Sequence, residues 1–330
     1  MLLQEALLVK LVKLVERIPE YPVSTKRGRG HPKVYAERLM VKALVIMVIR
    51  RLYTAYSLLA FLEQDTALTH QLKAVLTDEQ GRFPSRRTWE RRLKQLPDSL
   101  PGLIGSLGRY LVLVLCPFQE QGRAAAVDST RLCAQGGVWH KKHREAGVVP
   151  HSSIDTEADW SKSGYHGWWY GWKLHLACTI GSLWIPLAAE VTVANTYDAV
   201  IAPRLLEPLP DDIRYILGDR HYRDEEGRVE QHCHRAGRIL ITTQPGKYPH
   251  DDDGVEVRRI FHKLRSLAIE PFNGLFKNVF DWHGQVPVKG LRRTQLIVLG
   301  AVLVYQLVLL YQFEHHLTLG LAIKPLLRAA

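Results

Sequence analysis

Residues 172–193 read WKLHLACTIGSLWIPLAAEVTV. Two runs rich in apolar and β-branched residues flank Gly181-Ser182, a pair that suits the tight turn of a hairpin. The stretch therefore predicts two antiparallel strands joined by that turn. Runs of the same kind lie on either side of it: AAAVD at 124–128, IRYILGD at 213–219 and RILITT at 238–243.

The order of these runs predicts a mixed α/β fold. The first three follow one another as antiparallel strands, and a helix near 198–206 then crosses over to the fourth. This order resembles that of a ribonuclease H-like sheet, which helices around Glu270 and after Arg293 would cover. The expected fold class is thus a ribonuclease H-like mixed sheet flanked by helices, with an N-terminal all-helical region.

Helical periodicity dominates the chain before the first strand. An amphipathic helix at the start and a helical region from about 34 to 76 precede a short basic helix, RRTWERRLKQL at 86–96, for which Ser85 is a suitable N-cap. At about 100° per residue, Arg87, Arg91 and Lys94 gather on the side opposite its apolar residues. We expect a helical region at 1–122, an α/β domain at 123–318 and a C-terminal tail at 319–330.

The positive charge is concentrated in the helical region. Residues 1–125 hold 20 lysines and arginines against 11 acidic residues, whereas residues 126–330 hold 24 against 22. A basic segment ahead of a nearly neutral one is typical of a polyanion-binding module, and nucleic acid is our first expectation among DNA, RNA and membrane surfaces. The basic helix can be the recognition helix of a helix-turn-helix unit or the solvated face of an ordinary bundle helix.

Two observations bear on the compartment. The four cysteines form no CxxC pair, which favours a reducing cytoplasm over a disulfide framework. Residues 296–313 are almost long enough and apolar enough to span a membrane, but Gln306, Gln312 and Gly300 favour a buried core helix instead. We therefore expect a cytoplasmic protein without a membrane partner, and a membrane anchor is the alternative.

Carboxylates follow two of the strands. Asp128 ends AAAVD and Asp219 ends IRYILGD, so we expect both to reach a shared edge of the sheet. A third candidate, Glu270, lies in RSLAIEPFNGLFK at 265–277. Carboxylate oxygens are the ligands that Mg²⁺ prefers, and two such ions support phosphodiester chemistry. The proline after Glu270 places it either at the start of a helix or at a kink.

Five motifs occur in a characteristic order: AVDST, YGWKLHL, AEVTVANTYDA, ILGDRHYRD and RSLAIEPFNGLFK. Together they resemble the catalytic domain of a bacterial insertion-sequence transposase of the DDE class, over roughly residues 120–310. PSRRTWERRL at 84–93 is similar to the DNA-binding parts of such enzymes. The family's commonest glutamate signature in one large branch has Tyr and Arg where this chain has Lys263 and Ser266, so the chain departs from that branch.

The resemblance implies a set of roles. Asp128, Asp219 and Glu270 would be the catalytic metal ligands, with Mg²⁺ as cofactor and Mn²⁺ as a substitute. The enzyme would hydrolyse DNA at transposon ends and join the freed 3′-hydroxyl to target DNA, as a homodimer on terminal inverted repeats and target DNA in the bacterial nucleoid. The expected DNA contacts are Arg86, Arg87, Arg91, Lys94, Lys173, Trp168, Trp169, Arg265 and Lys277.

Other interpretations stay open at this point. The same fold can carry a metal-dependent nuclease without strand transfer, or an inactive DNA-binding relative. Trp168 and Trp169 belong to the aromatic segment WSKSGYHGWWYGW at 160–172, and their rings can stack on an unpaired base or cover one edge of the sheet.

Overall fold

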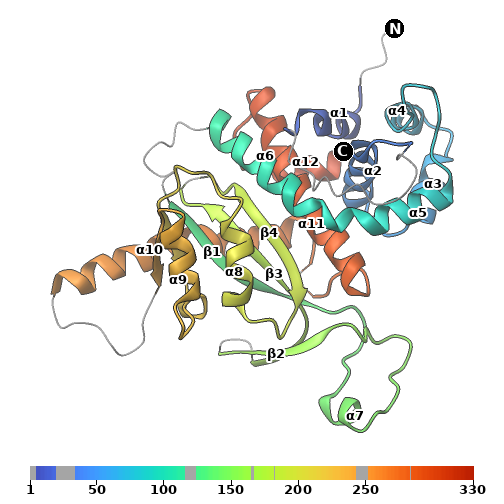
Figure 1. Ribbon diagram of the computed structural model, residues 1–330. Coiled ribbons are helices and arrows are strands. Elements are labelled where there is room, and N and C mark those ends of the chain that lie inside the picture. Colours follow the sequence, from blue (N-terminus) through green and yellow to red (C-terminus); the bar gives the residue numbers. More distant parts are fainter. Residues whose placement is uncertain are drawn as a thin grey trace. The chain divides into compact units, whose positions relative to one another are not determined.

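The computed structural model describes residues 5–19, 34–115, 124–164, 167–181, 183–242, 252–282 and 284–330. Contacts between residues divide the chain into two compact units. One comprises Met1–Leu107 and Arg292–Ala330, and the other comprises Gly108–Leu291 (Figure 1). This division differs from the boundaries at 122 and 318 that we expected from the sequence, since the segment after Arg292 groups with the N-terminal helices.

The first unit is helical. Its elements are α1 (Leu7–Lys13), η1 (Leu14–Arg17), α2 (Glu37–Ile49), α3 (Ala55–Leu62), α4 (Ala67–Val75), α5 (Arg86–Gln95), η2 (Leu96–Asp98), the first half of α6 (Leu100–Leu115), α11 (Leu291–Glu314) and α12 (Ile323–Ala329). The helical region expected at 34–76 is three helices. Capping boxes start two of them, Thr54 with Ser57 at α3 and Thr66 with Thr69 at α4.

Helix α11 is the apolar segment that length alone would allow to span a membrane. Its mean hydropathy is 2.2 over the most apolar window, and 89% of that window is buried inside the protein. A Cβ at Gly300 would lie 2.9 Å from the side chain of Leu44, so the glycine lets α2 pack closely against α11. The Gln306 amide donates to the Ile104 carbonyl at 2.9 Å. This is the environment of a core helix.

The second unit holds the sheet. In chain order its elements are β1 (Ala124–Cys133), α7 (Lys141–Glu145), β2 (Asp159–Ser163), β3 (Gly167–Thr179), β4 (Pro186–Val193), α8 (Asp198–Leu206), β5 (Tyr215–Gly218), η3 (Arg220–Tyr222), α9 (Arg228–Arg235), β6 (Ile239–Thr242) and α10 (Asp252–Val279). The second half of α6 precedes them. Every strand and the crossover helix that the sequence predicts are present.

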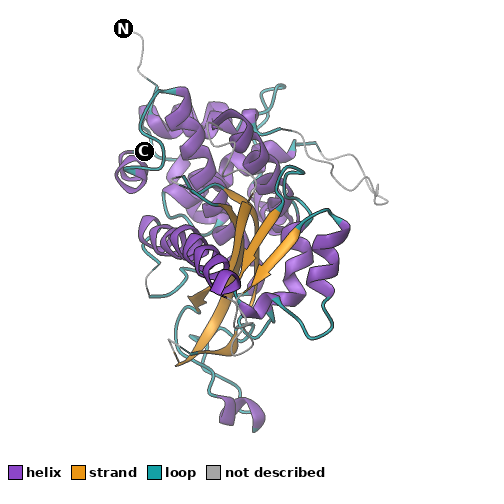
Figure 2. Cartoon of the chain, turned by 90° about the vertical axis from the view of Figure 1, so that its left-hand side faces the viewer, coloured by secondary structure: helices purple, strands orange, loops and turns teal. Residues whose placement is uncertain are grey.

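Strand pairing follows the expected order. Strand β3 pairs antiparallel with β1, β2 and β4, while β5 pairs parallel with both β1 and β6. Leaving out β2, the strands run β4-β3-β1-β5-β6, with α10 on one face and α8 and α9 on the other (Figure 2). The mixed α/β class with a helical N-terminal region is confirmed, and β2 is an addition that the sequence did not predict.

Candidate active site

The parallel pair β1 and β5 brings two of the expected carboxylates together. Their pairing covers Ala124–Ala126 and Tyr215–Leu217, so Asp128 and Asp219 each lie two residues beyond the last paired residue. Both therefore lie just beyond the paired part of two neighbouring parallel strands, on the side where α/β sheets bind ligands. We expected Asp128 to end its own strand, but β1 continues to Cys133 in register with β3.

Asp128 is an unusual carboxyl group. Its pKa is raised to about 7, chiefly by burial; the charge of Arg265 opposes the rise, and the neighbouring charge of Asp219 adds to it. The Asn273 amide of α10 donates to Asp128 Oδ2 at 3.4 Å. Asp128 is thus held between the sheet and α10, and it feels the charge of Asp219.

Asp219 takes its orientation from the residues that follow it. Its Oδ1 accepts from the backbone N–H of His221 at 2.9 Å, and its Oδ2 lies 2.9 Å from His221 Nδ1. The first contact caps the short helix η3. His221 therefore fixes the direction of this carboxylate, a role that the sequence did not suggest.

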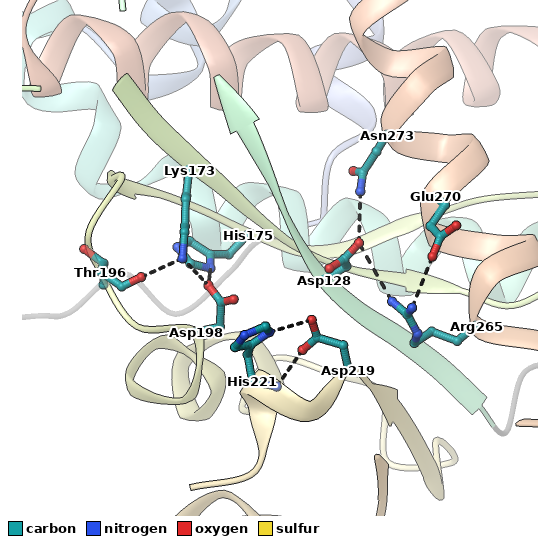
Figure 3. A network of polar contacts seen from close by, with 10 residues as sticks. All are labelled: Asp128, Lys173, His175, Thr196, Asp198, Asp219, His221, Arg265, Glu270 and Asn273. Carbon is teal, nitrogen blue, oxygen red and sulfur yellow. Dashed lines mark hydrogen bonds and ion pairs between the residues drawn. The ribbon is translucent and has the colours of Figure 1, made fainter. Parts of the chain in front are cut away.

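Glu270 is placed differently from the two aspartates. Its side chain is 55% exposed, and its Oε1 accepts from Arg265 Nη2 at 3.1 Å. Arg265 Nη1 lies 4.0 Å from Asp128 Oδ2, so one guanidinium lies between the two carboxylates (Figure 3). Pro271 lies well inside the long helix α10, which rules out the helix start that we considered for Glu270.

These residues fit a divalent cation in part. Asp128 and Asp219 supply hard oxygen ligands at one edge of the sheet. The buried Tyr222 hydroxyl feels both of their charges and has no hydrogen-bond partner among the described residues, which suits a polar ligand nearby. Within the described ranges no group of three or more His, Cys, Asp or Glu could hold a metal as the side chains stand. The Arg265 guanidinium lies between Glu270 and Asp128.

A second polar cluster lies on β3 and α8. Lys173 Nζ donates to Asp198 Oδ1 at 3.0 Å and to the Thr196 carbonyl at 2.9 Å. His175 Nδ1 lies 3.4 Å from the same carboxylate, and its Nε2 is 2.9 Å from Thr192 Oγ1. Lys173, which we expected to contact DNA, is thus mostly buried in an ion pair. The alternation in WKLHL places Lys173 and His175 on one face, and that signal could have identified the cluster.

Burial makes His175 a determinant of acid stability. It lowers the pKa of His175 to about 3, with a smaller contribution from the Lys173 charge, so the imidazole is neutral at pH 7. An unfolded histidine titrates near 6.5, so below that pH the unfolded chain binds a proton that the folded chain does not. Stability falls as the pH drops through 6.5.

When the pH falls from 7.5 to 5, the free energy of unfolding should decrease in both proteins. We expect the decrease to be about 2 kcal/mol smaller in His175→Gln than in the wild type. Urea unfolding of both proteins at the two pH values measures this difference. Equal losses in the two proteins would contradict the assignment of the neutral, buried state to His175.

The other residues that we expected to contact DNA differ in how exposed they are. Lys277 is half-buried, and burial, with the charge of Arg131, lowers its pKa to about 8. Trp168 is 64% exposed and lies over Lys162, with the ammonium 5.8 Å from the ring centre. Trp169 is 7% exposed, because neighbouring residues of a strand face opposite sides. Of the two tryptophans, Trp168 is the accessible one.

Helix α5 of the helical unit has the predicted two faces. Ser85 accepts from the Thr88 backbone N–H, as an N-cap does. Trp89 is buried, and Arg87, Arg91 and Lys94 are exposed. Arg86 pairs with Glu90 at 2.8 Å and lies over the ring of Tyr56.

No curated protein matches the chain. Among solved structures, the chain is similar to a piggyBac transposase synaptic complex with hairpin DNA, determined by cryo-electron microscopy. The identity is 8% and the TM-score 0.38, over 98% of this chain and 78% of that chain. The family model of the transposase DDE domain matches residues 119–307, which is more than half of the sequence and includes all three candidate carboxylates, so this chain belongs to that family.

Proposed function

We propose that the protein is a DNA transposase that cleaves transposon ends and joins the freed 3′-hydroxyl to target DNA. The observation that carries this proposal is the pair Asp128 and Asp219, each two residues beyond the paired part of two neighbouring parallel strands, in a chain of this family. We further propose that it acts in the cytoplasm on bacterial nucleoid DNA, as a homodimer that pairs two transposon ends.

The proposed metal ligands are Asp128, Asp219 and Glu270. Mg²⁺, or Mn²⁺ in its place, would supply charge neutralisation at the phosphate and activation of the attacking oxygen. The chain's own residues position these ligands: His221 orients Asp219, and Asn273 orients Asp128. Phosphoryl transfer needs positioning and electrostatic stabilisation more than covalent chemistry, so no protein nucleophile is required.

DNA contacts are proposed for both units. In the catalytic unit, Lys277 lies near the charge of Asp128, and Trp168 offers an exposed ring for stacking. Arg265 and Lys173 are paired with carboxylates, so they would contact DNA only after exchanging those partners. In the helical unit, the exposed face of α5 offers Arg87, Arg91 and Lys94 to phosphates. Arg86 and Trp169 complete the set of DNA contacts expected from the sequence.

Neutralising α5 tests the helical contact. We expect the triple variant Arg87→Gln, Arg91→Gln, Lys94→Gln to bind DNA more weakly and to reduce the slope of log affinity against log salt by about 3. Arg86→Gln is the matched control with a smaller effect, because Arg86 already pairs with Glu90. Fluorescence anisotropy with a labelled duplex, read at several salt concentrations, provides the measurement. A triple variant with wild-type affinity and slope would remove α5 from the DNA interface.

A joining assay tests the proposed reaction itself. The full chain is incubated with Mg²⁺, a duplex that ends in a terminal repeat of the element's own sequence, and a supercoiled target plasmid. Joined products are expected on a denaturing gel. Cleavage without joining would instead identify a nuclease, and DNA binding with neither reaction would identify an inactive relative.

A further inference from the structure

Arg265 is a buried cation between two carboxylates. The residue is 8% exposed, its Nη2 is 3.1 Å from Glu270 Oε1, and its Nη1 is 4.0 Å from Asp128 Oδ2. Its Nε is also buried and has no hydrogen-bond partner among the described residues. Charged groups are rarely buried unless they are paired, so these two carboxylates hold the arginine in place.

The pairing with Glu270 is not an ordinary contact along a helix. Side chains three or four residues apart share a helix face, but Arg265 and Glu270 are five apart. The guanidinium instead turns toward the sheet, where Asp128 lies (Figure 3). The position of Arg265 is therefore set by Asp128 on β1 together with Glu270, and not by the geometry of α10 alone.

Other buried arginines in the chain have a different kind of partner. Arg238 donates to the carbonyls of Leu206 and Leu209, and Arg92 donates to the carbonyl of Tyr35. Main-chain carbonyls of folded elements are permanent partners. The carboxylates beside Arg265 are residues that we propose as metal ligands, so its partners are the groups that a divalent cation would also bind.

We propose that Arg265 is a resident cation that holds Asp128 and Glu270 in the metal-free protein and competes with the divalent ion for them. This inference rests on the proposed function of the two carboxylates. A guanidinium does not lose its proton at accessible pH, so it yields the carboxylates only by moving away. Once displaced, it lies beside the site as a bidentate donor that suits a DNA phosphate. Metal and DNA therefore favour each other's binding.

Competition sets the expected size of the effect. If the guanidinium occupies its place in about nine molecules of ten, the apparent dissociation constant of the metal is about tenfold higher than without it. The test measures binding of Mn²⁺ alone to the full-length protein, by electron paramagnetic resonance of the free ion. We expect Arg265→Gln to bind Mn²⁺ about tenfold more tightly than the wild type.

Three variants make the result specific. Lys263→Gln removes the same charge from an exposed position on the same helix, and its dissociation constant should stay within about twofold of the wild type. Arg265→Lys keeps the charge but replaces the planar fork by a compact ammonium, and it should bind with intermediate affinity even if the glutamine variant does not fold. Asp128→Asn should bind Mn²⁺ much more weakly.

The outcomes separate the two proposals. If Asp128→Asn binds Mn²⁺ as tightly as the wild type, the metal site itself is wrong. If that variant loses binding but Arg265→Gln and Arg265→Lys bind no more tightly than the wild type, only the competition is wrong. Thermal unfolding gives a second readout: Mn²⁺ should raise the midpoint of Arg265→Gln more than that of the wild type, and an equal rise would also overturn the competition.

Discussion

Replacing Asp128 by asparagine should abolish DNA cleavage and joining while DNA binding persists. Asp128 lies on β1, next to Asn273 of α10 and within the influence of the Asp219 charge. The change removes the charge of this side chain and keeps the shape of the side chain. Loss of a single group that stabilises developing charge typically costs 10²–10³-fold in rate, so we expect a loss of about a thousandfold or more for a metal ligand. Single-turnover cleavage of an end duplex measures the rate, and anisotropy measures binding.

The control for this variant is Asp212→Asn, an exposed aspartate in the loop before β5. It should cleave at the wild-type rate, because its side chain is solvated. An Asp128→Asn protein that cleaves at the wild-type rate would refute the assignment of this residue to the metal.

The second large effect is expected at Gly171, where β3 meets β1. Its φ is +156°, and a Cβ there would lie 2.1 Å from the Leu132 carbonyl oxygen and 2.7 Å from the Ala134 nitrogen. Both atoms belong to the backbone, one within β1 and the other in the residue that follows it. A side chain at this position must therefore push the strands apart. Gly171→Ala should therefore cost roughly 3 kcal/mol or more of stability.

Gly167→Ala provides the matched comparison at the start of the same strand. Gly167 also has positive φ, +66°, but a Cβ there would meet no atom of the described residues within 4 Å. We expect that variant to lose about 1 kcal/mol, which is the cost of the backbone conformation alone. Urea unfolding monitored by tryptophan fluorescence separates the two. Equal losses would mean that the contact with β1 contributes nothing.

Runs of apolar and β-branched residues predicted five of the strands, and the sequence order predicted the crossover helix. The runs that became β1, β3, β4, β5 and β6 are rich in apolar or β-branched residues, and α8 occupies the expected crossover. Strand β2, DWSKS, lacks that composition and forms through its pairing with β3. The full length of β1 was missed for a similar reason, because the polar residues Ser129, Thr130 and Arg131 interrupt the apolar run after Asp128.

The candidate site was predictable only as far as strand position determines it. Asp128 and Asp219 lie near each other because each follows the paired part of two neighbouring parallel strands, and both apolar runs are visible in the sequence. The orientation of Arg265 depends on a carboxylate more than a hundred residues away, and no helical spacing reveals it. Lys173 faces Asp198 for the same kind of reason, since the pair forms between a strand and a crossover helix. The family resemblance assigned both cations to DNA contacts, and it carries no information about these carboxylate partners.

The grouping of α11 with the N-terminal helices affects how the chain acquires its structure. During synthesis the helices before Leu107 emerge first, but Arg292–Ala330 completes their unit only after the whole of Gly108–Leu291 has been made. The sheet unit is continuous in sequence, so it can fold as soon as it leaves the ribosome. The helical unit must meanwhile keep its apolar surface, including Leu44 opposite Gly300, without its partner helix. We therefore expect the basic half of the protein to mature last, after the sheet that carries Asp128 and Asp219 has already formed.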